Sequence, residues 1–291
     1  MRAYLPAYEL VAPPRWSDVL ALLAEEPGVW QPLAGGTDLM VVLATGRLPR
    51  GRYVSIWHLD ELRGIEVTPA SIVLGGLTTY TEVLEHPVLQ VEHPMLVEAA
   101  RQSGALAIQN RGTLAGNIVN ASPAADSPPA LLAYDAELEL VSAQGRRWVP
   151  YRGFHTGYKQ TIKRADELVA RIRLPRVPGG PDAVHAYRKV GTRKAQAIAK
   201  VGLAALGLVE DSVLVHLRLA LSSVAPTVFV PERTLALLEG RVLDAEVIED
   251  ILFTHSSGVR VLLSPSTPQE AEMVTPEHVR LALGFLTQLA D

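Results

Sequence analysis

The spacing of apolar side chains predicts a chain that mixes helices and strands. Residues 16–24 and 94–104 carry apolar residues at helical spacing, so we expect a helix in each. Apolar runs and strict alternation predict strands at 54–59, 71–76, 135–142, 167–175, 183–190 and 213–221. Because the helices and strands do not alternate regularly, the pattern favours an α+β fold over a doubly wound parallel sheet.

The C-terminal part carries further expectations. The Ala-rich stretch 194–208 predicts a helix, and a second helix is expected from Asp244 to Leu252. A last helix is expected to begin at Thr275 and Pro276, since proline is tolerated at the first helical position. The alternation in 213–221 places five apolar side chains on one face of a long strand: Val213, Val215, Leu217, Leu219 and Leu221.

Composition narrows the class of protein. The 291 residues are 48% hydrophobic and 20% charged with a net charge of −4, which predicts a soluble globular protein without a general nucleic-acid or membrane surface. No cysteine is present, so disulfides and Cys-ligated zinc or iron–sulfur clusters within this chain are excluded. No apolar run reaches the about 18 residues of a membrane span, and the start has no signal-peptide pattern. We therefore expect a cytoplasmic protein.

Several familiar motifs are missing. The chain has neither the G-x-G-x-x-G of a dinucleotide fold nor a P-loop, and it lacks the G-x-S-x-G of serine hydrolases. Its eight histidines are scattered without metal-ligand spacing, so we expect no metal site. The basic run 188–196 is either a solvated turn or an anion contact.

Two loops of small residues remain as candidate chemistry. In LAGGTDLM, 33–40, Gly35 and Gly36 lack a β-carbon, so backbone N–H groups can approach a diphosphate closely; the same stretch also suits a plain turn. In TLAGNIVNASPAAD, 113–126, small residues again permit close approach while Thr113, Asn117 and Asn120 supply polar groups. Asp126 either binds a ligand or caps the helix that follows. Together the loops indicate a dinucleotide, since its diphosphate needs N–H groups and its rings need small apolar neighbours.

Four ordered segments resemble the FAD-binding medium subunit of molybdenum hydroxylases, the family of xanthine dehydrogenase and aerobic carbon monoxide dehydrogenase. They are LAGGTDLM, QNRGTLAGNIVNASPAADSPPALLAYDAELEL, FHTGYKQTIKRADELVARIRLP and HAYRKVGTRKAQAIAKVGLAA, and the resemblance runs from about Tyr4 to about Leu238. Two positions depart from the family pattern: Ala115 stands where a second glycine is usual, and Gly76 stands where alanine is common. The last 50 or so residues also lack the usual Arg- and Tyr-rich ending.

The resemblance implies a fold and a cofactor site. The fold would be α+β, a vanillyl-alcohol-oxidase (PCMH) type FAD-binding domain of two α+β subdomains, 1–53 and 54–176, plus a C-terminal α+β domain, 177–291. The cofactor would be FAD, and no residue would be catalytic or bind a metal. The implied FAD contacts are Leu33, Ala34, Gly35, Gly36, Thr37, Asp38, Leu39, Gly104, Thr113, Gly116, Asn117, Val119, Asn120, Asp126, Leu168, Val169 and Lys189.

The resemblance also implies partners. FAD would take electrons from [2Fe-2S] clusters in a small partner subunit and pass them to NAD⁺ or another acceptor, while a large partner would hold molybdopterin. By analogy with the family, the complex would be a dimer of heterotrimers. One alternative is a stand-alone FAD oxidoreductase with Tyr158 or Tyr187 near the flavin. The other is a non-catalytic scaffold subunit.

Overall fold

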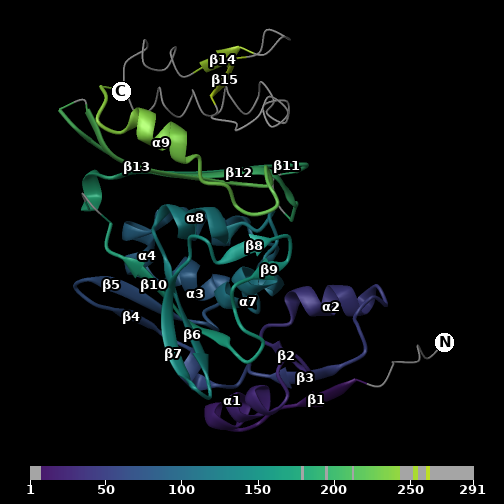
Figure 1. Ribbon diagram of the computed structural model, residues 1–291. Helices are drawn as coiled ribbons and strands as arrows, with labels where there is room; N and C mark the ends of the chain where they lie inside the picture. Colours follow the sequence, from purple (N-terminus) through teal and green to yellow (C-terminus); the bar gives the residue numbers. More distant parts are fainter. Residues whose placement is uncertain are drawn as a thin grey trace.

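The computed structural model describes residues 8–177, 180–193, 196–211 and 213–242, with 252–254 and 260–262 in addition. Figure 1 shows the three larger sheets one above the other, with helices between and around them. None of the helices within these ranges is long and apolar enough to cross a membrane.

The lowest layer in Figure 1 is a parallel sheet of three short strands in the order β1–β3–β2. Its elements are β1 (Glu9–Val11), α1 (Trp16–Glu25), β2 (Trp30–Leu33), α2 (Thr37–Ala44) and β3 (Arg52–Ser55). The predicted helix at 16–24 is confirmed as α1, which buries Val19, Leu20 and Leu23. The predicted strand at 54–59 starts earlier and ends at Ser55, where the chain enters turns.

The central layer is an antiparallel sheet in the order β4–β5–β10–β6–β7. Its strands are β4 (Ile65–Val67), β5 (Ser71–Gly75), β6 (Glu137–Ser142), β7 (Gly145–Pro150) and β10 (Leu168–Pro175). Its helices are α3 (Tyr80–Glu85), α4 (Pro87–Glu92), α5 (Pro94–Gln102), α6 (Leu106–Gln109), α7 (Leu114–Asn120) and α8 (Ser127–Ala133). The short hairpin β8 (His155–Gly157) and β9 (Gln160–Thr161) and the 3₁₀ turn Asp60–Leu62 complete this part.

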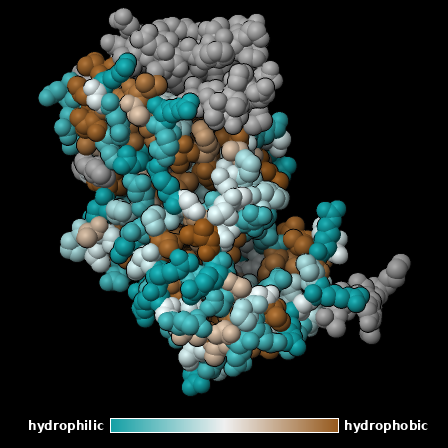
Figure 2. All heavy atoms as spheres, in the orientation of Figure 1, coloured by the Kyte–Doolittle hydropathy of each residue, from teal (hydrophilic) through white to brown (hydrophobic). Residues whose placement is uncertain are grey.

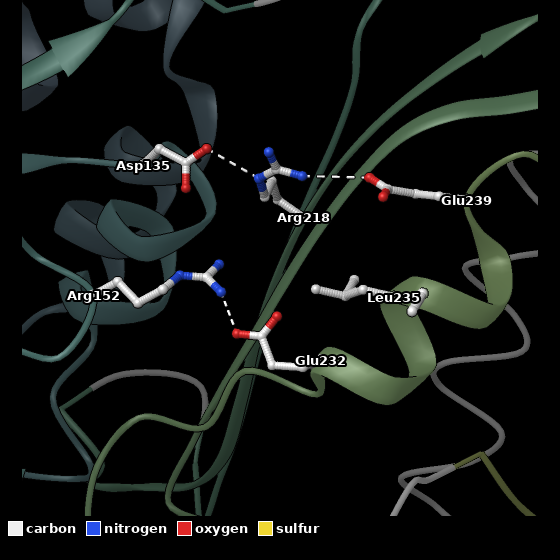
Figure 3. Close-up of a pocket in the computed structure, with 7 residues that line it drawn as sticks. Asp135, Arg152, Arg218, Glu232, Leu235 and Glu239 are labelled. Atoms are coloured by element: carbon white, nitrogen blue, oxygen red, sulfur yellow. Dashed lines mark hydrogen bonds and ion pairs between the residues drawn. The ribbon is translucent and has the colours of Figure 1, made fainter.

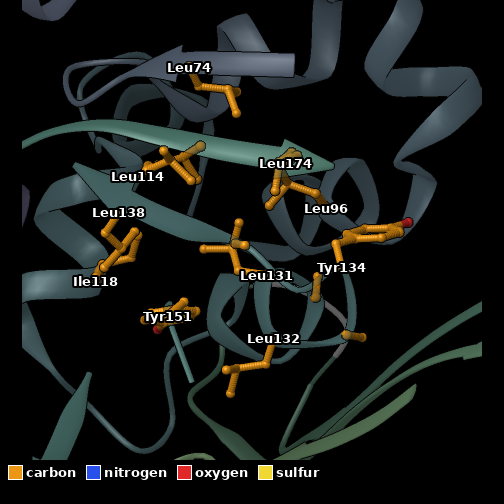
Figure 4. Close-up of a cluster of buried hydrophobic side chains, with 14 of the residues drawn as sticks. Leu74, Leu96, Leu114, Ile118, Leu131, Leu132, Tyr134, Leu138, Tyr151 and Leu174 are labelled. Atoms are coloured by element: carbon orange, nitrogen blue, oxygen red, sulfur yellow. The ribbon is translucent and has the colours of Figure 1, made fainter. Parts of the chain in front are cut away.

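The main hydrophobic core lies between this sheet and its helices (Figure 4). Leu74, Leu138 and Leu174 of the strands pack with Leu96 and Leu131 of the helices, all fully buried. A second cluster joins α1 to β6 and β10 through Val141, Leu168 and Ala170. The central sheet therefore packs against two different parts of the chain, which fixes the α1 layer relative to the helices.

The upper layer is an antiparallel sheet, β11 (Val184–Gly191), β12 (Ala199–Glu210) and β13 (Val213–Ser222), preceded by a 3₁₀ turn at Gly180–Asp182. One face packs on the central layer through small side chains such as Ala204 and Ala220. The other face packs against α9 (Glu232–Leu238) through Leu214, Leu217 and Leu235. A two-stranded pair, β14 (Leu252–Thr254) and β15 (Arg260–Leu262), completes the described elements.

The helix expected at 194–208 is wrong, because residues 199–208 lie in β12. The small side chains of this stretch allow close packing between neighbouring strands and do not indicate a helix. A β-carbon on Gly202 would lie 2.3 Å from Ser222 Oγ of the neighbouring strand, and Ala204 is completely buried. Tertiary packing has overridden a weak local preference.

The single apolar face expected for 213–221 is also corrected. The strand exists, but a register shift opposite Val215 leaves that residue 42% exposed while Leu214 is buried. Such a bulge changes which side chains share a face. The helix expected to end at Leu252 is wrong at that residue, which begins β14; the rest of it and the helix expected from Thr275 lie outside the described residues.

Candidate functional site

The two small-residue loops predicted as a cofactor site lie against each other. A β-carbon on Gly35 would stand 1.6 Å from the carbonyl oxygen of Arg111, so the two backbones touch at a place where only glycine fits. Arg111 Nε donates to Gly35 O at 3.4 Å, and Asn120 Nδ2 donates to Asp38 Oδ1 at 3.3 Å. Gly35 is thus required first by the protein's own backbone and not only by a ligand.

The first loop ends β2 and begins α2. Gly36 is the N-cap of α2 and has a φ of 77°, a left-handed conformation that glycine adopts without strain. No residue of α2 is buried, and Met40 and Val41 are 48% and 60% exposed. In Figure 2 a hollow separates the brown atoms of this helix from the central body of the molecule. The N–H groups of its first turn have no partner within the helix and can bind an anion.

The second loop is built around the start of α7. Thr113 is its N-cap, and its hydroxyl accepts from Gly116 N at 3.2 Å, which gives this buried side chain a structural role. Gly116 itself is exposed, and Val119 is 36% exposed. Farther along α7, Asn117 Oδ1 accepts from the Ser127 hydroxyl at 2.6 Å. The exposed side of α7 therefore consists of Gly116 and Val119, small or apolar groups without a protein partner to satisfy.

Asp126 and Lys189 form a buried ion pair of 2.8 Å with side chains 14% and 7% exposed. Ser103 Oγ donates to the same carboxylate oxygen at 3.2 Å, and Lys189 Nζ also donates to Gln102 O at 3.1 Å. Burial raises the pKa of Asp126, against the opposing influence of Lys189 and Ser103. The carboxylate makes no capping bond to α8, so the capping alternative is wrong.

The second carboxylate oxygen of Asp126 has no hydrogen-bond partner among the described residues. Oδ1 is buried without a hydrogen bond, although buried polar atoms are nearly always paired. Tyr187 does not bond Oδ1, because its hydroxyl donates to the backbone oxygen of Asp126 at 3.0 Å. An unpaired buried acceptor beside a buried cation is the group that a ligand hydroxyl would satisfy.

The other predicted contact residues lie deeper in the fold. Leu168 and Val169 are each 6% exposed and belong to the hydrophobic clusters on the two sides of the central sheet. Gly104, with a φ of 64°, turns the chain between α5 and α6. Leu33, Ala34 and Leu39 are partly buried in the first loop. Their contact with a cofactor stays a prediction.

Sequence reasoning missed two residues of this region. The Arg111 guanidinium lies over the ring of Trp57, 3.8 Å from its centroid, and joins it to the first loop. Lys159 donates to Asn120 Oδ1 at the exposed end of α7. Arg111 stands inside the quoted motif, but nothing in the sequence pairs it with Trp57, which is 54 positions away.

A separate cavity of about 320 Å³ lies between the upper and central layers (Figure 3). Arg218 bridges Asp135 at 3.0 Å and Glu239 at 3.3 Å, and Arg152 pairs with Glu232. The charged side chains of this cavity pair with one another, and none of its lining residues belongs to the two loops. In the part of the chain that is described, no group of three or more His, Asp or Glu side chains is arranged to hold a metal ion.

Comparison with known proteins gives consistent results. Residues 6–177 match the family model for the FAD binding domain in molybdopterin dehydrogenase, and residues 185–270 match that for the CO dehydrogenase flavoprotein C-terminal domain. The chain is 37% identical over 212 residues to a putative xanthine dehydrogenase FAD-binding subunit of Escherichia coli, covering 72% of each chain. It is 30% identical to the carbon monoxide dehydrogenase medium chain of Hydrogenophaga pseudoflava, covering 84% of each. A solved structure of carbon monoxide dehydrogenase from that organism superposes with a TM-score of 0.83 at 27% identity, covering 96% of each chain.

Proposed function

The chain belongs to the family of FAD-binding subunits of molybdopterin dehydrogenases, and on that premise we propose that it carries electrons through FAD within a multi-subunit molybdenum hydroxylase. The α+β fold expected from the sequence is confirmed by the match to the medium chain of carbon monoxide dehydrogenase. The chain is thus an FAD-dependent oxidoreductase subunit, while the route of its electrons is our proposal.

The observation that carries the proposal is the unpaired Oδ1 of Asp126, together with the cradle of the two loops. FAD offers sugar and ribityl hydroxyls that can donate to Oδ1, and a diphosphate that suits the free N–H groups at the start of α2. Gly36 and Gly116 leave room for it beside the hollow. The residues present therefore fit the cofactor.

The residues of this chain would bind and orient FAD and adjust its electrostatics. FAD itself supplies two-electron and one-electron transfer when bound. The first turn of α2, from Thr37 to Leu39, would hold the diphosphate, while Gly116, Val119 and Asn120 would line the opposite side. Lys189 would place a positive charge near the flavin, which favours the anionic reduced form. No side chain needs to act as an acid or base.

The source and destination of the electrons complete the proposal. We place [2Fe-2S] clusters in a small partner subunit and molybdopterin in a large one, since this chain has no cysteine to ligate a cluster. NAD⁺ or another acceptor would receive the electrons from FAD, in a dimer of heterotrimers. The cytoplasmic location expected from the sequence belongs to the same proposal.

The two alternatives have less support. A stand-alone oxidoreductase would need a tyrosine free to act on a substrate, but the Tyr187 hydroxyl is bound to the Asp126 backbone and burial raises its pKa. Tyr158 is 64% exposed without a contact that gives it a role. A scaffold that had lost its cofactor would not need to keep a buried carboxylate oxygen unsatisfied.

A spectrum of the purified chain tests the proposal. We expect flavin bands near roughly 370 and 450 nm after addition of FAD, and co-purification with cluster- and molybdenum-containing partners. Gly116→Val should lower FAD retention, because its side chain would project from the exposed side of α7. Its β-carbon would also press on the Thr113 hydroxyl, 2.7 Å away, so thermal unfolding is measured beside the spectrum to show that the variant folds. Gly51→Val is the matched control, since a β-carbon there meets only the Tyr53 ring at 4.0 Å. A chain that takes up no FAD contradicts the proposed function.

A further inference from the structure

Arg111 contacts the peptide group between Gly35 and Gly36 in the first loop. Its guanidinium lies over Trp57 while Nε donates to Gly35 O, and its own carbonyl abuts the α-carbon of Gly35. Arg63 shares the same ring at 4.6 Å and donates to the Trp57 carbonyl without reaching the loop. Trp57 thus carries two guanidinium groups, of which only one touches Gly35.

The geometry of a peptide group gives this contact a consequence. The C=O of Gly35 and the N–H of Gly36 belong to one planar trans peptide and point in opposite directions. Fixing the carbonyl on Arg111 therefore fixes the Gly36 N–H on the side away from Arg111. Two consecutive glycines would otherwise let this peptide rotate freely.

The charges around Trp57 and its two arginines also favour an anion at the start of α2. Across the described ranges, neither Arg111 nor Arg63 forms an ion pair with a carboxylate, whereas Asp38 at the start of α2 is bound by Asn120. The Trp57 stack thus carries two guanidinium charges without an ion pair, against the single carboxylate of Asp38, whose charge the neutral Asn120 amide does not remove. An anion bound at the start of α2 would be attracted by the two guanidinium charges.

We propose that Arg111 is a positioning residue for the FAD diphosphate: stacked on Trp57, it locks the Gly35–Gly36 peptide so that the Gly36 N–H faces the anion. This rests on the proposed function, because it presumes that FAD occupies the cradle. Arg111 acts through the loop, and the effect is specific to the diphosphate and not to the flavin ring.

Titration of the full chain with FAD and with riboflavin, followed by flavin fluorescence, tests the inference. Arg111→Gln should weaken FAD binding roughly ten- to hundredfold, the range for a lost hydrogen bond to a charged group, and should leave riboflavin binding within about twofold. Arg63→Gln is the matched control on the same ring. It removes one positive charge but no contact with the loop, so FAD binding should weaken far less than in Arg111→Gln and riboflavin binding should stay unchanged. Arg111→Lys keeps the charge and a donor for Gly35 O, so it should recover part of the FAD affinity.

The outcomes separate the two proposals. If the unaltered chain binds no FAD, the proposed function fails. If it binds FAD and Arg111→Gln binds it equally well, only the role of Arg111 is overturned. Two results would show that Arg111 supports the fold and does not position the diphosphate. In the first, Arg111→Gln weakens FAD binding and riboflavin binding to the same extent; in the second, Arg63→Gln weakens FAD binding as much as Arg111→Gln does. Thermal unfolding of the FAD-free variants identifies any that fail to fold.

Discussion

The upper sheet meets the central layer along two edges that differ in burial. At the β11 edge Lys189 and Asp126 are nearly buried, and one carboxylate oxygen has no hydrogen-bond partner within the part of the chain that the structure describes. At the β13 edge Arg218 and Asp135 are 28% and 49% exposed, and they line a cavity of about 320 Å³. The cavity of Figure 3 lies where the charges already pair with one another, and the unpaired carboxylate oxygen lies at the other edge.

The difference teaches that a cavity alone is a poor guide to the candidate site, and that the pairing of buried polar atoms is a better one. Solvent-exposed ion pairs replace hydrogen bonds to water with hydrogen bonds to each other, so they contribute little to the free energy of unfolding. A buried ion pair has lost its hydration, so a polar atom left there without a hydrogen bond costs considerable free energy. A ligand that bonds this atom recovers that free energy. Four predictions test this contrast, and they run from the largest expected effect to the smallest.

Lys189→Met should have the largest effect at the β11 edge. It leaves the Asp126 carboxylate buried without its cation, and breaking a buried pair in this way typically costs about 3 to 5 kcal/mol in the free energy of unfolding. Urea denaturation measures the change. The double variant Lys189→Met with Asp126→Asn is the control, and it should recover part of the loss. A loss below about 1 kcal/mol would remove the contrast between the edges.

His93 should make the same edge sensitive to acid. It is fully buried against Tyr134, with ring centroids 4.7 Å apart, and burial lowers its pKa from 6.5 to about 4. The folded protein then binds fewer protons than the unfolded chain between these values. Stability should therefore fall as the pH drops from about 6.5 to about 4, by about 3 kcal/mol in total. Urea titrations across this range should show a smaller slope for His93→Gln; an unchanged slope contradicts the assignment.

Tyr187→Phe should have a moderate effect. It removes the hydroxyl that donates to the Asp126 backbone at 3.0 Å, and a hydrogen bond of this kind contributes about 1 kcal/mol to stability. Thermal unfolding measures the change, with Tyr158→Phe as the exposed control. If Tyr187→Phe abolished electron transfer while the fold and FAD binding stayed intact, the stand-alone oxidoreductase would regain support.

Arg218→Gln should have the smallest effect. The guanidinium is shared by Asp135 and Glu239, but all three side chains are at least 28% exposed, so the loss should stay below about 1 kcal/mol and shrink further in salt. FAD affinity should not change, because none of the residues that line the cavity belongs to the two loops. A larger loss, or weaker FAD binding, would show that the β13 edge also supports the site.

Much of the fold follows from the sequence, but long-range packing does not. Alternation in 167–175 and helical spacing in 94–104 predict β10 and α5, because one face of each is strongly apolar. The stretch 199–208 misleads, since small residues suit both a helix and a crowded central strand, and only contact with β13 and α8 decides. The bulge at Val215 likewise depends on a partner strand.

The candidate site shows the same limit. Glycine-rich composition identifies both loops, but not which glycine is required by the protein and which is open to a ligand. The two departures from the family pattern, Gly76 and Ala115, are explained by their contact in the folded protein. A β-carbon on Gly76 would lie 3.4 Å from that of Ala115 and 2.4 Å from Val169 O. The methyl group gained at one position faces the one missing at the other. Arg111 and Trp57 were missed because their pairing is purely tertiary.

The contact between Gly35 and the Arg111 backbone has a consequence for how such chains change over evolutionary time. Since a β-carbon there would stand 1.6 Å from a carbonyl oxygen of the same chain, selection for folding alone preserves this glycine. A descendant that had abandoned its cofactor would keep Gly35 and be free to replace the exposed Val119, whereas a β-carbon on Gly116 would still stand 2.7 Å from Thr113 Oγ1. Substitution at Val119, and not at the paired glycines of the first loop, is therefore where loss of the flavin would first become visible.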